Sequence, residues 1–308
     1  MSRILFSIIT PVYNTPLNFL EVCMESLRAQ KMQECEFIIV SDGATEEENE
    51  ICENFARKDC RFKFFKRKHS GVSATRNFAL KQVQGEYIGF VDADDYIDDA
   101  MLQECYAFAT SNHCDIVTKD IFRTINGRNI LMRQKPSSLA PNTIIRDILR
   151  EKILGGICYR FVRRDFLQEH NVYFQEDLQY GEDAVFWIKL LQQNPKVSYL
   201  NKAFYHYVDN IQSITKKYTI TSYQANKKYI SALKTILDEN FQDDINVAAL
   251  IVKVSAMRAH IMTLKEFASY ERTHFRSIWR ASFRFIAKLY LTIYLALSSC
   301  SAKLNILH

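Results

Sequence analysis

Three carboxylates, Asp92, Asp94 and Asp95, form an acidic cluster directly after the short apolar run 87–91. The run is rich in β-branched and aromatic residues, which is typical of a strand buried on both faces. Acids do not continue such a strand, so we expect it to emerge there at its carboxyl end, where open α/β sheets bind ligands. Because side chains alternate along an extended chain, Asp92 and Asp94 are expected on the same side of the backbone. Two carboxylates placed together suit Mg²⁺ or Mn²⁺ carrying a phosphate. Taken alone, the cluster would equally suit a turn that caps the helix starting near Asp98.

Polar side chains follow two earlier strand-like runs in the same way. The run 5–10 leads into Tyr13 and Asn14, and the run 36–40 leads into Asp42. Because the carboxyl ends of parallel strands meet at one edge of a sheet, we expect these side chains to gather beside the acidic cluster.

A further polar element is the sequence Gly-Val-Ser-Ala-Thr-Arg-Asn at 71–77, which opens a predicted helix. The N–H groups at a helix start and the guanidinium of Arg76 suit a phosphate. The chain contains neither G-x-x-x-x-G-K-[ST] nor G-x-G-x-x-G. ATPase and dinucleotide-binding functions are therefore disfavoured.

Strand-like and helical segments alternate up to the acidic cluster, which predicts a parallel, doubly wound α/β sheet. The predicted strands are 5–10, 36–40, 62–65, 87–91, 115–125, 129–133, 157–162, 197–200 and 203–208. The predicted helices are 15–30, one from 46, 71–83, 98–112, 143–152, 184–193 and most of the chain from 222 to its end.

The composition is that of an ordinary globular protein, with 308 residues of which 48% are hydrophobic. The net charge of +5 is mild and no basic-aromatic patch stands out, so we expect no nucleic-acid partner. Eight cysteines are scattered without C-x-x-C spacing, which disfavours a zinc site and a disulfide framework. The chain enters a strand-like run within a few residues of Met1, and no segment reaches the roughly 20 apolar residues of a membrane span. A cytoplasmic protein is expected.

Five motifs in a fixed order resemble those of glycosyltransferase family 2, over roughly residues 4–215. They are Pro11-Val12-Tyr13-Asn14, Ser41-Asp42-Gly43, the 71–77 sequence, Asp92-Ala93-Asp94-Asp95 and Gly181-Glu182-Asp183. One such motif is weak evidence, but five in order on the expected strand ends are specific. The resemblance implies the GT-A fold, which is α/β with a Rossmann-like, mostly parallel central sheet flanked by helices. It also implies an inverting enzyme that uses a nucleoside-diphosphate sugar, usually a UDP-sugar.

The resemblance also implies roles for single residues. Pro11, Tyr13 and Asn14 would line the nucleotide, and Asp42 would receive the uracil edge. Arg76 would lie near the nucleotide and Asp92 near the ribose. Asp94 would bind Mn²⁺ or Mg²⁺, and Asp183 would be the general base. Inverting transfer needs a carboxylate to take the acceptor hydroxyl's proton and a group that stabilises the departing diphosphate. Without the other motifs, Glu182-Asp183 would be interpreted as the acidic first turn of a helix.

The sequence departs from the family pattern after the aromatic cluster 205–207, where Val208 replaces a frequent arginine. Phosphate contacts from that loop would then have to come from Lys216 and Lys217, which follow closely. Ala44 stands where serine often follows Asp-Gly. His206 is a candidate further metal ligand, and a packed or solvent-facing strand histidine is the alternative. The lack of a Q-x-x-R-W motif disfavours a processive, membrane-spanning synthase.

The C-terminal region has a basic amphipathic pattern, with arginine or lysine at 276, 280, 284 and 288 opposite an apolar stripe from Trp279 to Leu297. Such a helix can lie in a membrane interface, or it can pack on the catalytic domain with its arginines solvated. We predict a GT-A catalytic domain over 1–220, made of a nucleotide-sugar-binding half 1–115 and an acceptor-side half 116–220, and an α-helical extension over 221–308 that contacts a membrane surface through 278–297.

The expected function is transfer of a sugar to a hydroxyl of a glycan or lipid-linked acceptor in bacterial surface polysaccharide synthesis, such as lipopolysaccharide or capsule. The protein would be peripheral on the inner face of the cell membrane. One alternative is a catalytically inactive nucleotide-sugar-binding relative, which the joint presence of Asp42, Asp94 and Asp183 disfavours. The other is a nucleotidyltransferase, disfavoured because the chain lacks a glycine-rich N-terminal phosphate loop followed by a basic residue.

Overall fold

The computed structural model of the protein describes residues 3–209, 218–259 and 261. The chain divides into two compact units. The sheet unit comprises residues 1–145 and 153–213, and the hairpin unit comprises residues 146–152 and 214–308. The predicted domain boundary at residue 220 stays a prediction.

A nine-stranded sheet forms the centre of the sheet unit, in the order β3-β2-β1-β4-β8-β6-β9-β5, with β7 paired to β6. The strands are β1 (Phe6–Val12), β2 (Cys35–Asp42), β3 (Phe62–Arg67), β4 (Tyr87–Phe90), β5 (Tyr96–Ile97), β6 (Ile116–Ile125), β7 (Arg128–Met132), β8 (Arg160–Arg163) and β9 (Val197–Val208). Strands β1 to β4 pair in parallel, as do β6 and β9. The pairs β4–β8, β6–β8, β6–β7 and β5–β9 are antiparallel. The parallel strands β1 to β4 are the doubly wound part that the alternation of strands and helices predicts.

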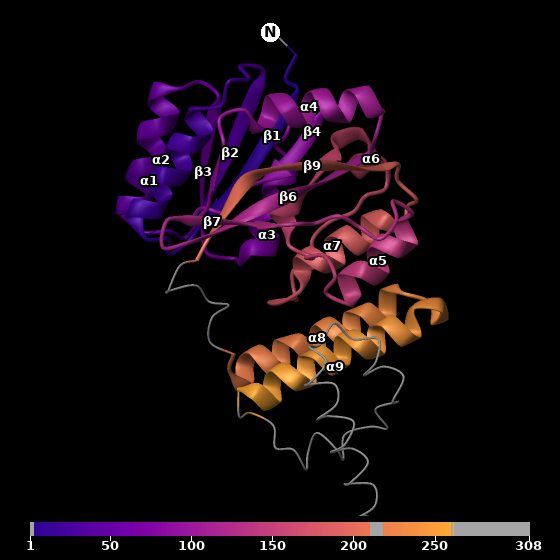
Figure 1. Ribbon diagram of the computed structural model, residues 1–308. Coiled ribbons are helices and arrows are strands. Elements are labelled where there is room, and N and C mark those ends of the chain that lie inside the picture. The colour runs from indigo at the N-terminus through magenta and orange to yellow at the C-terminus, as the bar shows by residue number, and fades with distance from the viewer. Residues whose placement is uncertain (1–2, 210–217, 260, 262–308) are drawn as a thin grey trace, which may run out of the picture. The chain divides into compact units, whose positions relative to one another are not determined.

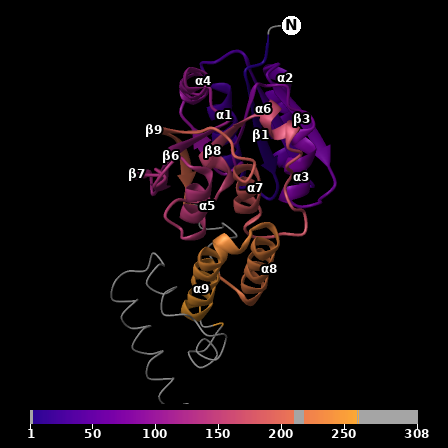
Figure 2. The same cartoon turned by 90° about the vertical axis from the view of Figure 1, so that its right-hand side faces the viewer.

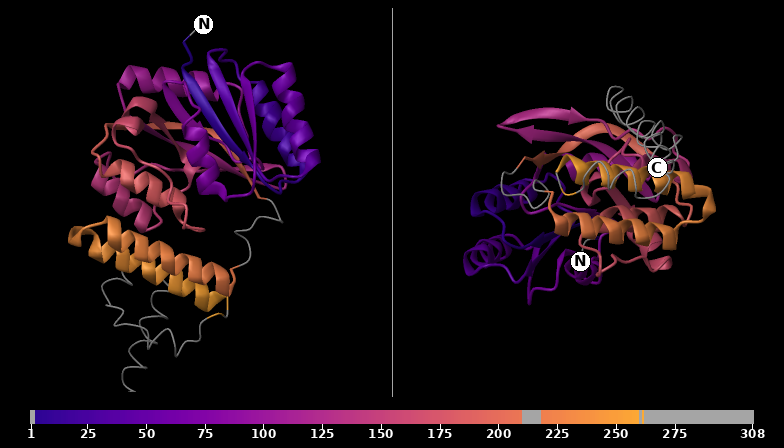
Figure 3. Two further views of the ribbon diagram at one scale, coloured as in Figure 1. Left: turned by 180° about the vertical axis from the view of Figure 1, so that it is seen from behind. Right: turned by 90° about the horizontal axis from the view of Figure 1, so that it is seen from below.

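Helices cover both faces of this sheet (Figures 1 and 2). On one face, α1 (Leu17–Arg28), α2 (Glu46–Lys58) and α4 (Met101–Asn112) share one core with alternate side chains of the strands, such as Phe6 and Ile8 of β1. The opposite face carries α3 (Val72–Leu80) and α7 (Glu182–Leu191). The sheet unit also contains α6 (Arg164–Glu169) and the first residues of α5 (Pro141–Leu149). Seen from behind in Figure 3, β1 to β3 with α1 and α2 form the indigo side of the sheet.

Two short sequence signals fold as their residue types predict. Thr45 and Glu48 form a capping box at the start of α2, in which each side chain accepts a hydrogen bond from the other residue's backbone N–H. Asn126 and Gly127 both have positive φ, 48° and 74°, in the turn between β6 and β7. These two residue types tolerate the left-handed backbone that a tight hairpin requires.

The hairpin unit contains α8 (Ile220–Ile236) and α9 (Gln242–Arg258), which run antiparallel around a short 3₁₀ turn (Figure 3). Val247, Leu250 and Val254 form the centre of its apolar core. Asp244 is buried and forms ion pairs with Arg146 and Arg150, both in the 146–152 segment of the same unit. These charges tie the end of α5 to the start of α9.

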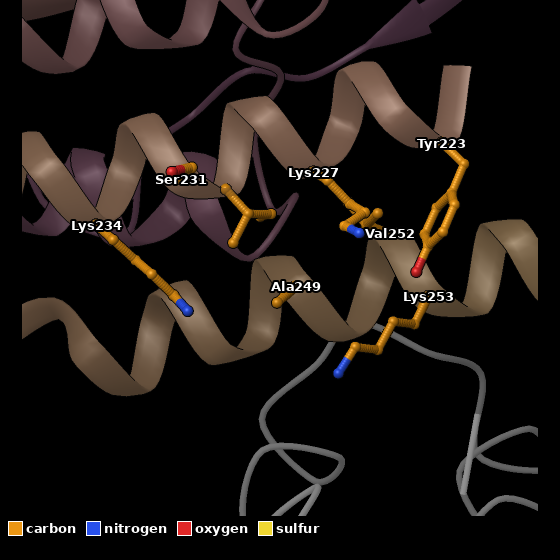
Figure 4. A pocket seen from close by; sticks show the side chains of 8 residues that line it. Tyr223, Lys227, Ser231, Lys234, Ala249, Val252 and Lys253 are labelled. Atoms are coloured by element: carbon orange, nitrogen blue, oxygen red, sulfur yellow. The ribbon is translucent and has the colours of Figure 1, made fainter. Parts of the chain in front are cut away.

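A groove of about 200 Å³ lies between α8 and α9 (Figure 4). Apolar side chains and three lysines line it, among them Ile230, Ala249, Val252, Lys227, Lys234 and Lys253. Among the described helices, none is both long enough and apolar enough to cross a membrane. The predicted amphipathic helix around 276–297 lies outside the described residues.

Two strand predictions differ from the structure. The predicted strand 157–162 begins as a 3₁₀ turn at Ile157–Tyr159 and becomes β8 only from Arg160. The two predicted strands at 197–200 and 203–208 form the single strand β9, whose register against β6 shifts in the middle. A shift of this kind interrupts the apolar alternation, so one strand has the sequence pattern of two.

Candidate active site

The carboxyl ends of β1, β2 and β4 meet at one edge of the parallel sheet, as predicted. β1 ends at Val12, just before Tyr13 and Asn14, and β2 ends on Asp42. β4 ends two residues before Asp92. Asn14 has a φ of 51° and is exposed, so the chain leaves the strand through a left-handed turn at this edge.

Arg76 is the centre of a buried charge network. Helix α3 places its side chain at 4% exposure. Its Nη2 donates to Oδ1 of Asp92 at 3.0 Å, and its Nη1 donates to Oδ1 of Asp183 at 2.7 Å. Oε1 of Glu182 lies 3.6 Å from the same Nη1. The Arg76 guanidinium therefore joins the acidic cluster to the acidic pair that starts α7. Arg76 and Asp183 are 107 residues apart in the chain.

The Asp183 carboxylate is held from two sides. Its Oδ2 accepts a hydrogen bond from the backbone N–H of Ile157 at 3.0 Å, while Oδ1 contacts Arg76. Burial raises the pKa of Asp183 to about 7, and Glu182 and Asp92 act in the same direction against the opposing Arg76. The side chain is still 22% exposed. A fixed, reachable carboxylate with a pKa near neutrality is suited to general-base chemistry.

Gly181 sets the direction in which α7 begins. It has a φ of 75° and is the residue that precedes the first turn of the helix. Glycine adopts this left-handed backbone at no steric cost. Glu182 and Asp183 then occupy the first turn of α7, where the helix dipole favours negative charge.

Asp42 is buried and holds the 69–71 segment that leads into α3. Its Oδ1 accepts hydrogen bonds from the backbone N–H of Ser70 at 2.7 Å and from the Ser70 hydroxyl at 3.1 Å. Its Oδ2 accepts from the N–H of Gly71 at 2.9 Å and lies 3.1 Å from Nδ1 of His69. The His69 ring stacks on Tyr13 with 4.2 Å between ring centres. Asp42 therefore also fixes the position of the half-exposed Tyr13 ring.

Asp95, the third acid of the cluster, connects the cluster to β9. Its Oδ2 accepts from the hydroxyl of Tyr205 at 2.5 Å and its Oδ1 accepts from the N–H of Val208 at 2.8 Å. The Tyr205 hydroxyl also accepts from the N–H of Asp92 at 3.2 Å. Burial raises the pKa of Asp95 well above its ordinary value, and the nearby Asp92 and Asp94 act in the same direction. The motif at 92–95 contains Asp95 but predicts no separate role for it.

His206 is packed between aromatic rings. Its imidazole stacks on Tyr96 at 4.2 Å and on Phe122 at 5.0 Å between ring centres, and its Nε2 lies 2.9 Å from Oδ1 of Asp98. Only 4% of the residue is exposed. These contacts favour the packed strand histidine, and a metal-binding role for His206 stays a prediction.

Comparison with known proteins identifies the family. The model of Glycosyl transferase family 2 matches residues 7–170, which is more than half of the chain. The chain belongs to glycosyltransferase family 2. The edge that carries Asp42, the acidic cluster and Arg76 lies inside the matched region, whereas Asp183 lies beyond it.

Relatives of known sequence or structure agree with the family and the fold. The uncharacterized glycosyltransferase EpsJ of Bacillus subtilis (strain 168) is 32% identical over 221 residues, which span 69% of this chain and 63% of EpsJ. The crystal structure of S. aureus TarS 1-349 in complex with UDP-GlcNAc has a TM-score of 0.68 at 23% identity, covering 90% of this chain and 84% of that chain. The mannosyltransferase PcManGT from Pyrobaculum calidifontis, in complex with GDP-Man and Mn²⁺, has a TM-score of 0.52 at 12% identity, covering 96% of this chain and 81% of that chain. The fold is the GT-A fold that the motifs predict.

The acidic cluster fits a divalent cation that a family 2 enzyme would bind together with its donor. In the part of the chain that the structure describes, no three His, Cys, Asp or Glu side chains form a metal site by themselves. Mg²⁺ is commonly held by one or two carboxylates together with substrate phosphates, so a complete protein cage is not required. Asp94 and the one-third exposed Asp92 provide such a donor set.

The structure brings part of the predicted site into direct contact. Arg76, Asp92 and Asp183 form one network. Pro11 lies near the end of β1 and pairs in register with Val40 of β2. The nucleotide, metal and base roles of the predicted residues stay predictions. The sequence alone does not single out His69, which stacks on Tyr13, or Phe174, which stacks on Phe186 of α7. Asn77, which holds the Phe174 backbone, carries a signal because it lies within the 71–77 motif.

Proposed function

We propose that this protein is an inverting glycosyltransferase that transfers a sugar from a nucleoside-diphosphate sugar, in particular a UDP-sugar, to an acceptor hydroxyl. The observation that carries the proposal is the Arg76 bridge. It links Asp92, at the strand edge expected to hold the nucleotide, to the partly buried Asp183 whose pKa is about 7. Donor binding and proton removal would then take place within one hydrogen-bonded network.

In the proposed reaction, Asp183 accepts the proton of the acceptor hydroxyl as the hydroxyl oxygen attacks the anomeric carbon. The bond between that carbon and the diphosphate oxygen breaks on the opposite side, which inverts the configuration and releases the nucleoside diphosphate. The hydrogen bonds from Ile157 and Arg76 fix the carboxylate in one orientation before the acceptor arrives. A Mn²⁺ or Mg²⁺ ion held by Asp94, when bound, would supply positive charge for the departing diphosphate.

On the nucleotide side, we propose that the half-exposed Tyr13 ring contacts the base. Asp42 already accepts hydrogen bonds from Ser70 and Gly71. Its primary contribution would therefore be to fix the 69–71 segment. Direct contact between Asp42 and the uracil edge would require His69 or Ser70 to give up its contact with one of the Asp42 carboxylate oxygens.

The proposed setting is the synthesis of a bacterial cell-surface polymer on a glycan or lipid-linked acceptor. TarS is named a poly(ribitol-phosphate) beta-N-acetylglucosaminyltransferase, which supports this class of process and makes UDP-GlcNAc the first donor to test. We also propose peripheral membrane attachment through 278–297. The lysines around the groove of the hairpin unit, Lys227 and Lys234 among them, carry the charge that anionic headgroups attract.

The deciding experiment is a donor screen that measures which product the protein releases. We expect UDP to be released from at least one UDP-sugar, in a reaction that depends on Asp183. Binding of UDP-sugars without any release would favour the inactive relative. Release of pyrophosphate in place of a nucleoside diphosphate would favour the nucleotidyltransferase.

A further inference from the structure

Asn77 uses its whole side-chain amide to hold a distant segment of the chain. Its Oδ1 accepts from the backbone N–H of Phe174 at 2.8 Å, and its Nδ2 donates to the carbonyl of Phe174 at 3.0 Å. The same Nδ2 donates to Oε1 of Glu176 at 2.9 Å. Asn77 is 8% exposed and its two bonds to the Phe174 backbone are buried, so water competes little for them. The bond to the exposed Glu176 is partly buried.

Phe174, which Asn77 holds, connects Asn77 to helix α7. Its ring stacks on Phe186 of α7 with 4.1 Å between ring centres and an angle of 3° between the ring planes. It also meets Phe90 of β4 edge-on at 5.7 Å, and the Arg76 guanidinium lies 5.5 Å from its ring centre. Phe186 follows Asp183 by three residues, so the two side chains are neighbours on α7.

The consecutive residues Arg76 and Asn77 therefore approach α7 by two routes. Arg76 contacts the Asp183 carboxylate directly, whereas Asn77 acts through Phe174 and Phe186 on the helix that carries it. We propose that Asn77 is a positioning residue for Asp183, holding Phe174 so that α7 presents the carboxylate to the acceptor. This inference rests on the proposed function, because it assumes that Asp183 is the base.

At position 77, only an amide side chain of this length can make all three hydrogen bonds. Aspartate would keep the bond from the Phe174 N–H but would place a second carboxylate against Glu176 and against the Phe174 carbonyl. Alanine would leave the Phe174 backbone groups buried without their partners, which is costly. A misplacement of about 1 Å at a catalytic group can cost about 100-fold in rate.

The test compares Asn77→Asp and Asn77→Ala with Gln30→Ala in the full-length protein. Gln30 is a matched control, since it is buried and makes three side-chain hydrogen bonds that join α1 to the start of α4. Three quantities are measured for each protein. They are UDP affinity by calorimetry, hydrogen exchange of peptides covering 174–181, and UDP release from whichever of UDP-GlcNAc, UDP-glucose and UDP-galactose the wild type uses fastest.

For both Asn77 variants we expect unchanged UDP affinity, faster exchange over 174–181 and a fall in UDP release of about 10-fold or more. Gln30→Ala should change none of the three. Adding Glu176→Gln to Asn77→Asp returns an amide donor to the pair and should recover part of the lost turnover. That recovery also separates positioning from general loss of structure.

Unchanged exchange over 174–181, or full turnover in a variant whose exchange has risen, would overturn the inference. So would an equal loss of turnover in Gln30→Ala. A wild type that binds UDP but releases it from no UDP-sugar would instead refute the proposed function. The exchange measurement would then still show whether Asn77 holds Phe174.

Discussion

Replacing Asp183 by asparagine separates what this carboxylate does for catalysis from what it costs the fold. The amide keeps the shape of the side chain and can still accept the hydrogen bond from Ile157, but it cannot take a proton. We expect UDP binding to persist while turnover falls by about 10² or more. The structure also predicts that the same variant gains stability relative to wild type as the pH rises, because the wild type loses the contribution of protonated Asp183.

The size of that gain follows from the raised pKa. An aspartate in the unfolded chain titrates near pH 3.9, whereas burial raises the pKa of Asp183 to about 7 in the folded protein. Between these values the folded state binds more protons than the unfolded state, so each pH unit lowers the free energy of unfolding by about 1.4 kcal/mol. The contribution of Asp183 is complete below pH 3.9 and lost as the pH passes 7. The total is at most about 4 kcal/mol.

The measurement is urea unfolding of wild type and Asp183→Asn between pH 4.5 and 8, followed by the fluorescence of the buried Trp187 on the same helix. Taking the difference in the free energy of unfolding between the two proteins cancels the contributions of titratable groups that both contain. We expect the variant to become progressively more stable relative to wild type up to about pH 7. A difference that does not change with pH would refute the burial argument for Asp183. Glu182→Gln is the matched control, and if it alone abolishes turnover the base is Glu182.

Three further perturbations test the metal, the charge network and the tail. Asp94→Ala should abolish transfer and weaken UDP binding only while Mn²⁺ or Mg²⁺ is present, and equal UDP affinity of wild type and variant in saturating Mn²⁺ would contradict the metal assignment. Arg76→Met should lower the free energy of unfolding at pH 8 by about 3–5 kcal/mol, because Asp92 and Asp183 lose their common partner, and a loss comparable to that of an exposed ion pair would show that the network contributes little to folding. Truncation after Tyr270 should leave UDP binding intact and strongly weaken salt-sensitive binding to anionic liposomes, and a truncated protein that binds them as well as the full chain would place the membrane contact elsewhere.

The location of the site could be predicted from the sequence because local signals agreed with one another. Asp42 and Asp92 follow apolar runs that are buried strands, and parallel pairing brings the ends of such strands to one edge. The five motifs also predicted the family and the GT-A fold, which the comparisons confirm. Predicting the location of the site, the family and the fold requires only the residues within each segment and the order of the segments.

The contact between Arg76 and Asp183 could not be predicted, because it joins residues 107 positions apart. Arg76 at a helix start is as well suited to a phosphate as to carboxylates, and nothing near it in the sequence indicates Asp183 as a partner. Its two terminal nitrogens contact Asp92 and Asp183 in the structure, and contact with the nucleotide stays a prediction. His206 poses the same difficulty, since the ring of Phe122 that packs on it belongs to another strand.

The way the later strands enter the sheet limits how this enzyme could be recombined with a relative. β8 lies between β4 and β6, and β9 pairs with β5, so the strands of residues 6–97 and those of residues 116–208 are interleaved in one sheet. A chimera joined near residue 115 would have to re-form these strand pairs and the Arg76 bridge from unmatched sequences. Exchanging the loop residues between Glu176 and Gly181 would leave all of them, and the Asn77 contacts, in place. We therefore expect that loop to be the practical unit for exchange with a relative.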